Sequence, residues 1–193
     1  MKLNEPSRLL AVGRMVPKKG FDVLLAACAL LKRRLAFRCI IVGSGPQYRT
    51  LRRHARTLGL DDNVTFLGWQ SYSAMPRLYR ASDVLVVPSV EGLDGDRDGL
   101  PNVVTESLAC GTPVVASDFA GLPEAIWHEE TGLLVAPGDP LALAAAVERM
   151  LRDPELRTHV AEQGRALAEA RFDGRSNVRR VRDLLVETAG LAK

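Results

Sequence analysis

Short apolar runs alternate with longer stretches of helical periodicity over the first two thirds of the chain. Nearly every run stops at a glycine, a proline or a serine, which is typical of buried strands that end in a turn. The runs predict strands at residues 8–12, 37–42, 64–67, 84–87, 113–116 and 132–135.

Stretches rich in helix-forming residues fill the spaces between these runs and make up the C-terminal third. Continuous apolar strands separated by helices indicate a parallel sheet that helices cover on both faces. Right-handed crossover connections then give a doubly wound sheet. The predicted fold class is therefore α/β, a doubly wound, Rossmann-like parallel sheet with a helical C-terminal tail. Helices are predicted at residues 21–31, 48–58, 75–81, 101–110, 123–127, 140–151, 154–172 and 177–188.

Glycine and polar residues gather directly after the predicted strands. Gly13, Gly43 and Gly68 each follow a strand, and so do the segments 89–99 and 117–121. All strands of a parallel sheet that point the same way end at one edge, so these segments are expected to converge. Ligands of doubly wound sheets bind at that edge.

Two carboxylates flank the start of the fourth predicted helix. Asp98 lies on a glycine loop and Glu106 lies inside the helix, eight positions later. Pro101 suits the first helical position, which leaves the amides of Asn102 and Val103 as free donors at the positive end of the helix dipole. Such an end binds phosphate. A nucleotide sugar, with phosphate at one end and hydroxyls at the other, fits this arrangement.

The composition is that of a soluble globular domain, with 47% hydrophobic and 25% charged residues among 193. No apolar run approaches the ~18 residues of a membrane span, and no signal peptide precedes the first strand. A net charge of +3 is too small to indicate nucleic-acid binding. Cys28, Cys39 and Cys110 lie in apolar segments and are expected to be buried, reduced thiols of a cytosolic protein.

Arginines cluster on two of the predicted helices. Solvation of a helix face explains both clusters, and attraction to an anionic membrane surface or to a missing acidic partner domain is the alternative. The clusters are Arg49, Arg52, Arg53 and Arg56, and Arg175, Arg179, Arg180 and Arg182.

Asp98 and Glu106 are separated by seven residues and followed by Gly-Thr-Pro-Val-Val, and Arg14 and Lys19 lie in a Gly-Arg…Lys-Gly segment. These features resemble the C-terminal, donor-binding domain of the family 4 retaining glycosyltransferases of GT-B fold, whose first carboxylate is usually glutamate. Members that build bacterial exopolysaccharides, including colanic acid, are similar. The resemblance covers roughly residues 8–185, and further matching segments are 42–46, 64–69, 120–124 and 131–139.

The resemblance implies that residues 1–193 form a single nucleotide-sugar binding domain and that the family's N-terminal acceptor domain is absent. The complete enzyme would transfer a hexose from a UDP or GDP sugar to an acceptor hydroxyl, with retention and without a metal ion or another cofactor. The isolated domain would transfer little or nothing. The expected partners are the donor and the acceptor domain, with no nucleic acid. The expected location is the cytoplasm, with peripheral contact at the inner face of the membrane in the full enzyme.

Each matching residue takes a role from the family. Arg14 and Lys19 would stabilise the leaving diphosphate, because a guanidinium fits the phosphate oxygens and an ammonium adds a point charge. Glu106 would accept hydrogen bonds from both ribose hydroxyls, and Asp98 would contact the transferred sugar. The predicted catalytic residues are Arg14, Lys19, Asp98 and Glu106, and the predicted nucleotide contacts are Gly13, Gly99, Leu100, Asn102, Val103 and Glu106.

Two assignments around Asp98 have alternatives, and one expectation concerns the residue next to Lys19. Glu91 begins a Glu-Gly-Leu segment that also resembles the family's first carboxylate position, but Asp98 keeps the eight-residue register to Glu106. The segment 94–96 reads Asp-Gly-Asp, which binds a metal in a different glycosyltransferase fold and is interpreted here as an acidic surface loop. Lys18 is expected to be solvated.

Two other function classes stay open. The chain could be a non-catalytic nucleotide-sugar binding module, or half of a split two-chain enzyme. It could also be a Rossmann-like protein that binds NAD, for which residues 43–45 (Gly-Ser-Gly) are weak support because Tyr48 stands where a third glycine would fall.

Overall fold

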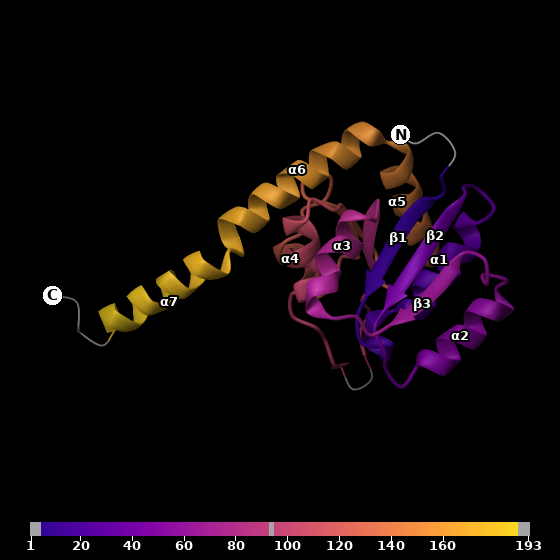
Figure 1. The fold of residues 1–193 in the computed structure, drawn as a ribbon, viewed down its shortest axis with the longest axis horizontal. Coiled ribbons are helices and arrows are strands. Elements are labelled where there is room, and N and C mark those ends of the chain that lie inside the picture. The colour runs from indigo at the N-terminus through magenta and orange to yellow at the C-terminus, as the bar shows by residue number, and fades with distance from the viewer. Residues whose placement is uncertain (1–4, 93–94, 189–193) are drawn as a thin grey trace.

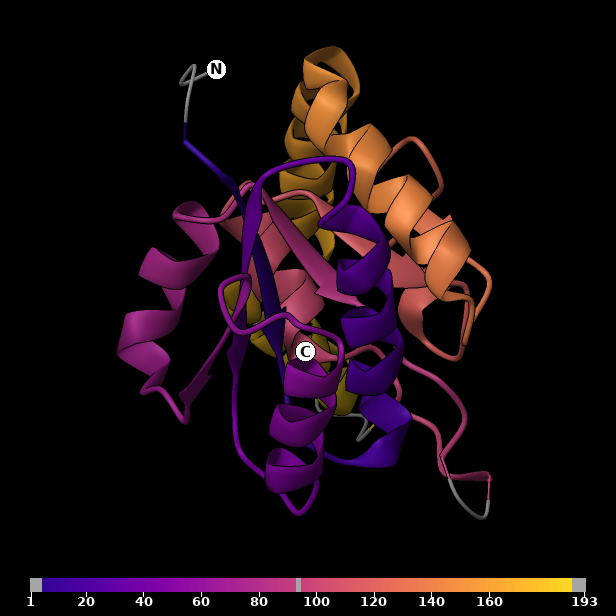
Figure 2. The same cartoon turned by 90° about the vertical axis from the view of Figure 1, so that its right-hand side faces the viewer.

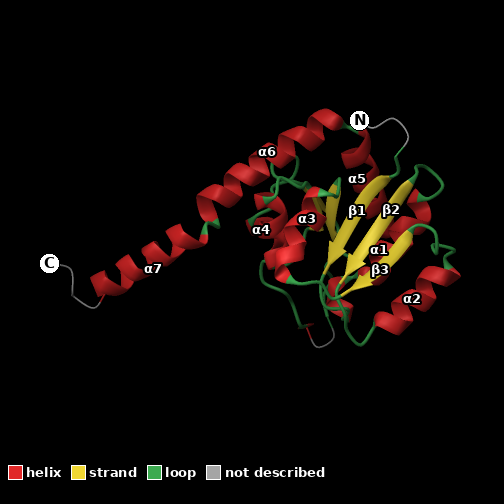
Figure 3. Cartoon of the chain, viewed as in Figure 1, coloured by secondary structure: helices red, strands yellow, loops and turns green. Residues whose placement is uncertain are grey.

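The computed structural model describes residues 5–92 and 95–188. Its centre is a six-stranded sheet in which neighbouring strands pair in parallel, in the order β3-β2-β1-β4-β5-β6. Figure 3 shows β3, β2 and β1 side by side. The predicted doubly wound parallel sheet is therefore confirmed. The strands are β1 (Ser7–Val12), β2 (Phe37–Val42), β3 (Val64–Gly68), β4 (Val84–Val87), β5 (Val114–Ser117) and β6 (Leu133–Val135).

Helices cover both faces of the sheet (Figures 1 and 2). One apolar core lies under α1, α2 and α5, and the other lies under α3 and α4. The alternation of side chains along a strand supplies both cores, since Leu9 of β1 faces the first and Leu10 faces the second. The helices are α1 (Phe21–Leu31), α2 (Tyr48–Thr57), α3 (Met75–Arg80), α4 (Asn102–Ala109), α5 (Pro140–Arg152), α6 (Pro154–Arg171) and α7 (Gly174–Thr188).

The winding of the sheet reverses between β1 and β4. The chain runs outward from β1 through β2 to β3, and then returns to place β4 on the other side of β1. At such a reversal the loops that follow the two strands diverge and leave a crevice at the carboxyl edge, where ligands bind. The loop after β1 carries Gly13 and Arg14, and the loop after β4 carries Asp98.

Glycines let the loops at this edge touch backbone to backbone. A Cβ at Gly43 would overlap the carbonyl oxygen of Gly13, and a Cβ at Gly20 would overlap that of Pro88. The amide of Met15 donates to the carbonyl of Ser44 at 2.8 Å, which joins the loops after β1 and β2. The edge is therefore a packed surface in which each loop fixes its neighbour.

Several predicted helix boundaries are corrected. Pro101 is the N-cap of α4 and not its first residue, because its ψ of 133° is extended and the helix begins at Asn102. α7 begins at Gly174, earlier than predicted, because the carboxylate of Asp173 accepts from the amide of Ser176 at 2.8 Å and caps the helix. The helix predicted at 123–127 is a single 3-10 turn, Leu122–Glu124. Cys28 and Cys39 are buried as predicted, but Cys110 is only half-buried.

The last helix extends away from the body of the molecule (Figure 1). None of the residues described in α7 is buried, and apolar side chains on it are exposed, including Val178, Leu184 and Leu185. The arginines of the second predicted cluster lie on the same helix and are exposed.

Replacing Gly20 with alanine is predicted to destabilise the chain more than the same change at Gly111. Both glycines have a left-handed φ, 61° and 70°, which costs an L-residue about 1–2 kcal/mol. A Cβ at Gly111 meets nothing within 4 Å, whereas at Gly20 it overlaps the backbone of Pro88 and adds roughly 1–3 kcal/mol of overpacking. Urea unfolding of both variants measures the difference, and equal losses would show that the contact between these loops contributes nothing.

Candidate functional site

The loop that leads into α4 is held from the side by the loop after β5. Gly121 in that second loop is buried, and a Cβ there would overlap the amide of Leu100 and the carbonyl carbon of Gly99. Only glycine permits this approach. The backbone of Gly99 and Leu100 is therefore fixed just before the helix begins.

The first turn of α4 presents its amides at the carboxyl edge of the sheet. The amide of Val104 donates to the carbonyl of Pro101 at 2.9 Å. Asn102 and Val103 precede it, and their amides have no carbonyl one turn earlier in the helix. These two donors, with the positive end of the helix dipole behind them, are available to an anion.

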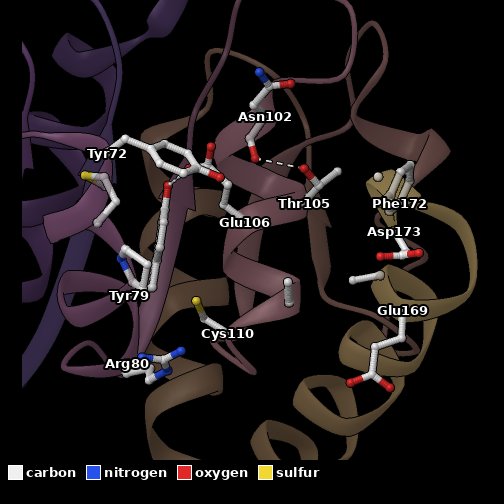
Figure 4. Close-up of a pocket in the computed structure, with 15 residues that line it drawn as sticks. Tyr72, Tyr79, Arg80, Asn102, Thr105, Glu106, Cys110, Glu169, Phe172 and Asp173 are labelled. Carbon is white, nitrogen blue, oxygen red and sulfur yellow. Dashed lines mark hydrogen bonds between the residues drawn. The ribbon is translucent and has the colours of Figure 1, made fainter. Parts of the chain in front are cut away.

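Glu106 lies one turn into α4 and is half-buried. The hydroxyl of Tyr79, from α3, donates to Glu106 Oε2 at 2.7 Å (Figure 4). Burial raises the pKa of the Tyr79 hydroxyl well above its usual value, and the hydrogen bond to Glu106 and the negative charge of that carboxylate raise it further. Tyr79 therefore stays protonated and holds one carboxylate oxygen, while no residue in the described part of the chain donates to the other oxygen.

Glu106 reaches a cavity of about 640 Å³ at the carboxyl edge, here called the edge cavity. Gly13 and Arg14 from the loop after β1 line the same cavity. Arg14 is exposed, and its side chain makes no hydrogen bond or ion pair with any residue that the structure describes. Further lining comes from the loops after β2 and β3, through Gly43, Ser44, Gly45, Trp69, Gln70 and Tyr72.

Glu106 also lines a second cavity, of about 690 Å³, between α3, α4 and the junction of α6 with α7 (Figure 4). Asn102 and Thr105 from α4 and Cys110, the residue just after it, face this cavity, with Phe172 opposite. Neither Gly13 nor Arg14 lines this second cavity. The edge cavity is the one that brings predicted site residues from different loops together.

Lys19 and Asp98 form an ion pair, and neither lines the edge cavity. Lys19 Nζ lies 2.6 Å from Asp98 Oδ2, and Lys18 Nζ lies 3.2 Å from Asp98 Oδ1. Burial raises the pKa of the Asp98 carboxyl, but Lys19 and Lys18 together outweigh this effect and hold it below its usual value. The expectation that Lys18 is solvated is wrong, because both Asp98 and Asp96 pair with it.

Glu91, the alternative to Asp98, has a different partner. Its carboxylate pairs with Arg97 at 2.8 Å, and the guanidinium of Arg97 lies over the ring of Phe119. Asp98, and not Glu91, lies beside Lys19. In the 94–96 segment Asp96 is exposed and pairs with Lys18, while Asp94 lies outside the described residues.

Within residues 5–92 and 95–188, no group of three or more His, Cys, Asp or Glu side chains is arranged to hold a metal ion. The same part of the chain contains no helix that is both long and apolar enough to cross a membrane.

Tyr79 is the clearest site residue that the sequence did not indicate. It follows an apolar pattern on a short helix and is almost fully buried, so it looks like an ordinary core residue. Trp69 and Tyr72 were missed as well, although both are large, exposed aromatics after β3. Their exposure beside the edge cavity appears only once the fold is known.

Residues 2–167 match the model of the family described as glycosyl transferases group 1. The chain therefore belongs to this family. It is similar to the amylovoran biosynthesis glycosyltransferase AmsK of Erwinia amylovora, with 32% identity over 97% of this chain and 46% of the relative. It is also similar to the GDP-mannose-dependent α-(1-6)-phosphatidylinositol monomannoside mannosyltransferase of Mycobacterium tuberculosis, with 34% identity over 89% of this chain and 45% of the relative.

The fold is similar to that of solved glycosyltransferases. Anabaena HepE, crystallised in complex with UDP-glucose, superposes with a TM-score of 0.85 at 26% identity, covering 95% of this chain and 49% of HepE. The chain thus spans about half the length of the relatives that it matches.

Replacing Tyr79 with phenylalanine is predicted to make the free energy of unfolding fall less steeply as the pH rises into the alkaline range. Above about pH 10 the unfolded chain releases the Tyr79 proton while the folded chain keeps it, so the free energy of unfolding falls as the pH rises. This one proton contributes a slope of about 1 kcal/mol per pH unit, which the variant lacks. Urea unfolding between pH 9.5 and 11 measures the slope. The control Tyr72→Phe, which removes an exposed hydroxyl, keeps the wild-type slope, and a Tyr79→Phe slope equal to wild type would contradict the assignment.

Proposed function

We propose that this group 1 glycosyl transferase chain is the half of the enzyme that binds a nucleotide-diphosphate sugar. Together with an acceptor-binding N-terminal half, it would support transfer of the sugar to an acceptor hydroxyl with retention. The observation that carries the proposal is the edge cavity, where Gly13, Arg14 and Glu106 meet at the reversal of the sheet. The named activities of AmsK and the mycobacterial mannosyltransferase support transfer, and the complex of HepE supports a nucleotide-sugar donor.

In this proposal the nucleoside occupies the edge cavity. The free oxygen of Glu106 accepts from a ribose hydroxyl, while Tyr79 holds the other oxygen. Gly13 lets the backbone approach the ligand closely. The base would lie against the loops after β2 and β3, near Ser44 and Trp69.

The diphosphate would lie between Arg14, Lys19 and the first turn of α4. The charge of Arg14 is unpaired among the residues that the structure describes, and the amides of Asn102 and Val103 point the positive end of a helix at the same edge. Gly99 and Leu100 supply the fixed backbone that precedes them. These groups stabilise the charge that grows on the leaving diphosphate, so the proposed reaction needs no metal ion.

Asp98 would contact the transferred sugar. As the bond between the anomeric carbon and the diphosphate oxygen breaks, the acceptor oxygen would bond to that carbon on the same face, and its proton would pass to the leaving diphosphate. The pairing of Asp98 with Lys19 supports this position over Glu91, because it puts the carboxylate beside a cation proposed for the diphosphate.

The complete enzyme is proposed to work in the cytoplasm, in peripheral contact with an anionic membrane face. Exposed arginines on one side of α2 support such a contact, since each cation near an anionic surface contributes about 1 kcal/mol. They are Arg49, Arg52, Arg53 and Arg56.

Calorimetric titration without metal is predicted to show binding of one nucleotide, UDP or GDP, and of its sugar conjugates. Arg14→Ala and Glu106→Ala each remove a charged hydrogen-bonding group worth about 1.5–3 kcal/mol, so each should weaken binding at least about tenfold. Arg33→Ala and Glu162→Ala change exposed residues away from the site and serve as controls with wild-type affinity. EDTA should change nothing. Binding that survives both site substitutions would contradict the assignment.

Transfer of sugar by the 193-residue chain alone is predicted to be near background. Adding the N-terminal half of a group 1 relative in trans should restore transfer if the two halves associate, because it supplies the proposed acceptor site. Product formation from a radiolabelled nucleotide sugar, with and without the added half, measures both states. Robust transfer by the chain alone would show that it needs no acceptor domain.

A further inference from the structure

Each oxygen of the Asp98 carboxylate has its own lysine. Lys19 Nζ contacts Oδ2 at 2.6 Å and Lys18 Nζ contacts Oδ1 at 3.2 Å. The side chains of all three residues are only about one-fifth exposed, between 18% and 22%. The two cations therefore do not duplicate each other, since each fixes a different oxygen.

We propose that Lys18 is the positioning residue that keeps the Asp98 carboxylate ionised and oriented toward the transferred sugar when Lys19 pairs with the donor diphosphate. This inference rests on the proposed function, in which Lys19 binds phosphate and Asp98 binds the sugar. An anion that draws Lys19 away would leave a half-buried carboxylate without one of its counter-ions. Lys18 remains to compensate that charge.

The surroundings of Lys18 favour this fixed role. The amide of Val90, in the loop after β4, donates to the carbonyl of Lys18 at 3.0 Å, which ties the backbone of Lys18 to the start of that loop. Its ammonium is shared between Asp98 and Asp96, with 3.0 Å to the latter. The hydrogen bonds from Lys18 to Asp96 and to Asp98 raise the pKa of its ammonium, so it stays charged.

Lys19 has fewer restraints of this kind. Among the described residues, Asp98 is the only carboxylate with which Lys19 forms an ion pair. An incoming diphosphate therefore has one ion pair to replace at Lys19, and at Lys18 it would have two. Because Lys19 has one ion pair and Lys18 has two, Lys19 is the cation that moves to the diphosphate and Lys18 is the one that stays with Asp98.

A direct diphosphate contact by Lys18 predicts another result. In that case, loss of the Lys18 charge would weaken binding of the nucleotide itself. A positioning role leaves the nucleotide affinity nearly unchanged and removes the additional affinity that the sugar contributes through Asp98.

The first test follows the Asp98 carboxyl by carbon-13 NMR during pH titration of the ligand-free 193-residue chain. Lys18→Met, which keeps the apolar stem, is predicted to raise the Asp98 titration midpoint by about one pH unit, because it removes an opposite charge within 4 Å. Lys18→Arg should restore most of the shift. Arg97→Met removes a cation from the same loop that pairs with Glu91 and not with Asp98, and should change the midpoint much less.

The second test compares the affinities of UDP with UDP-glucose, and of GDP with GDP-mannose. Lys18→Met should leave nucleotide binding within about twofold of wild type and abolish any preference for the sugar conjugate, as Asp98→Asn should. A wild-type chain that binds neither nucleotide would refute the proposed function, while the NMR titration would still decide whether Lys18 holds Asp98. An unchanged Asp98 midpoint in Lys18→Met, or a tenfold loss of nucleotide binding, would overturn the positioning role.

Discussion

Backbone contacts between loops at the carboxyl edge of the sheet determine where every candidate site residue lies. Parallel strands deliver their loops to one edge, and the loops can share that space only where a side chain is missing. Gly43 lies on Gly13, Gly20 on Pro88, and Gly121 on the backbone of Gly99 and Leu100. These contacts fix the backbone that carries the cations after β1, the carboxylate after β4 and the first turn of α4. Ion pairs then hold the side chains of Lys18, Lys19 and Asp98 in place.

The charged groups on these loops are of two kinds, those open to a ligand and those already paired. Arg14 and the amides of the first turn of α4 are open to an incoming anion. Lys19, Asp98, Lys18 and Asp96 instead neutralise one another. Binding of a diphosphate at Lys19 would exchange one partner for another without exposing a new charge, because Lys18 remains with Asp98. Tyr79 likewise occupies one oxygen of the Glu106 carboxylate. In the proposed function the other oxygen accepts from the ligand.

The sequence predicts most of the fold because the apolar runs and the glycines that end them are local signals. Strand positions, the parallel sheet and the gathering of loops at one edge all follow from them. The pattern predicts the start of α7 too late, because Asp173 caps the helix just before a glycine. It also predicts Pro101 inside α4, although the extended ψ of Pro101 puts it outside the helix. In both cases the capping geometry, and not helix propensity, sets the boundary.

Side-chain pairing is less accessible from sequence, since it depends on distant contacts. Lys18 looked like a solvated neighbour of Lys19, yet it is 78 positions from the Asp96 that binds it. Tyr79 is 27 positions from Glu106, and nothing near it in the sequence indicates its role.

A crystal structure of the chain with UDP-glucose tests the central claim most directly. The account predicts the ribose at Glu106 and the diphosphate between Arg14, Lys19 and the start of α4, with Lys18 still paired with Asp98. A ligand seated in the cavity between α3, α4 and α6, with no contact to Arg14, would contradict it.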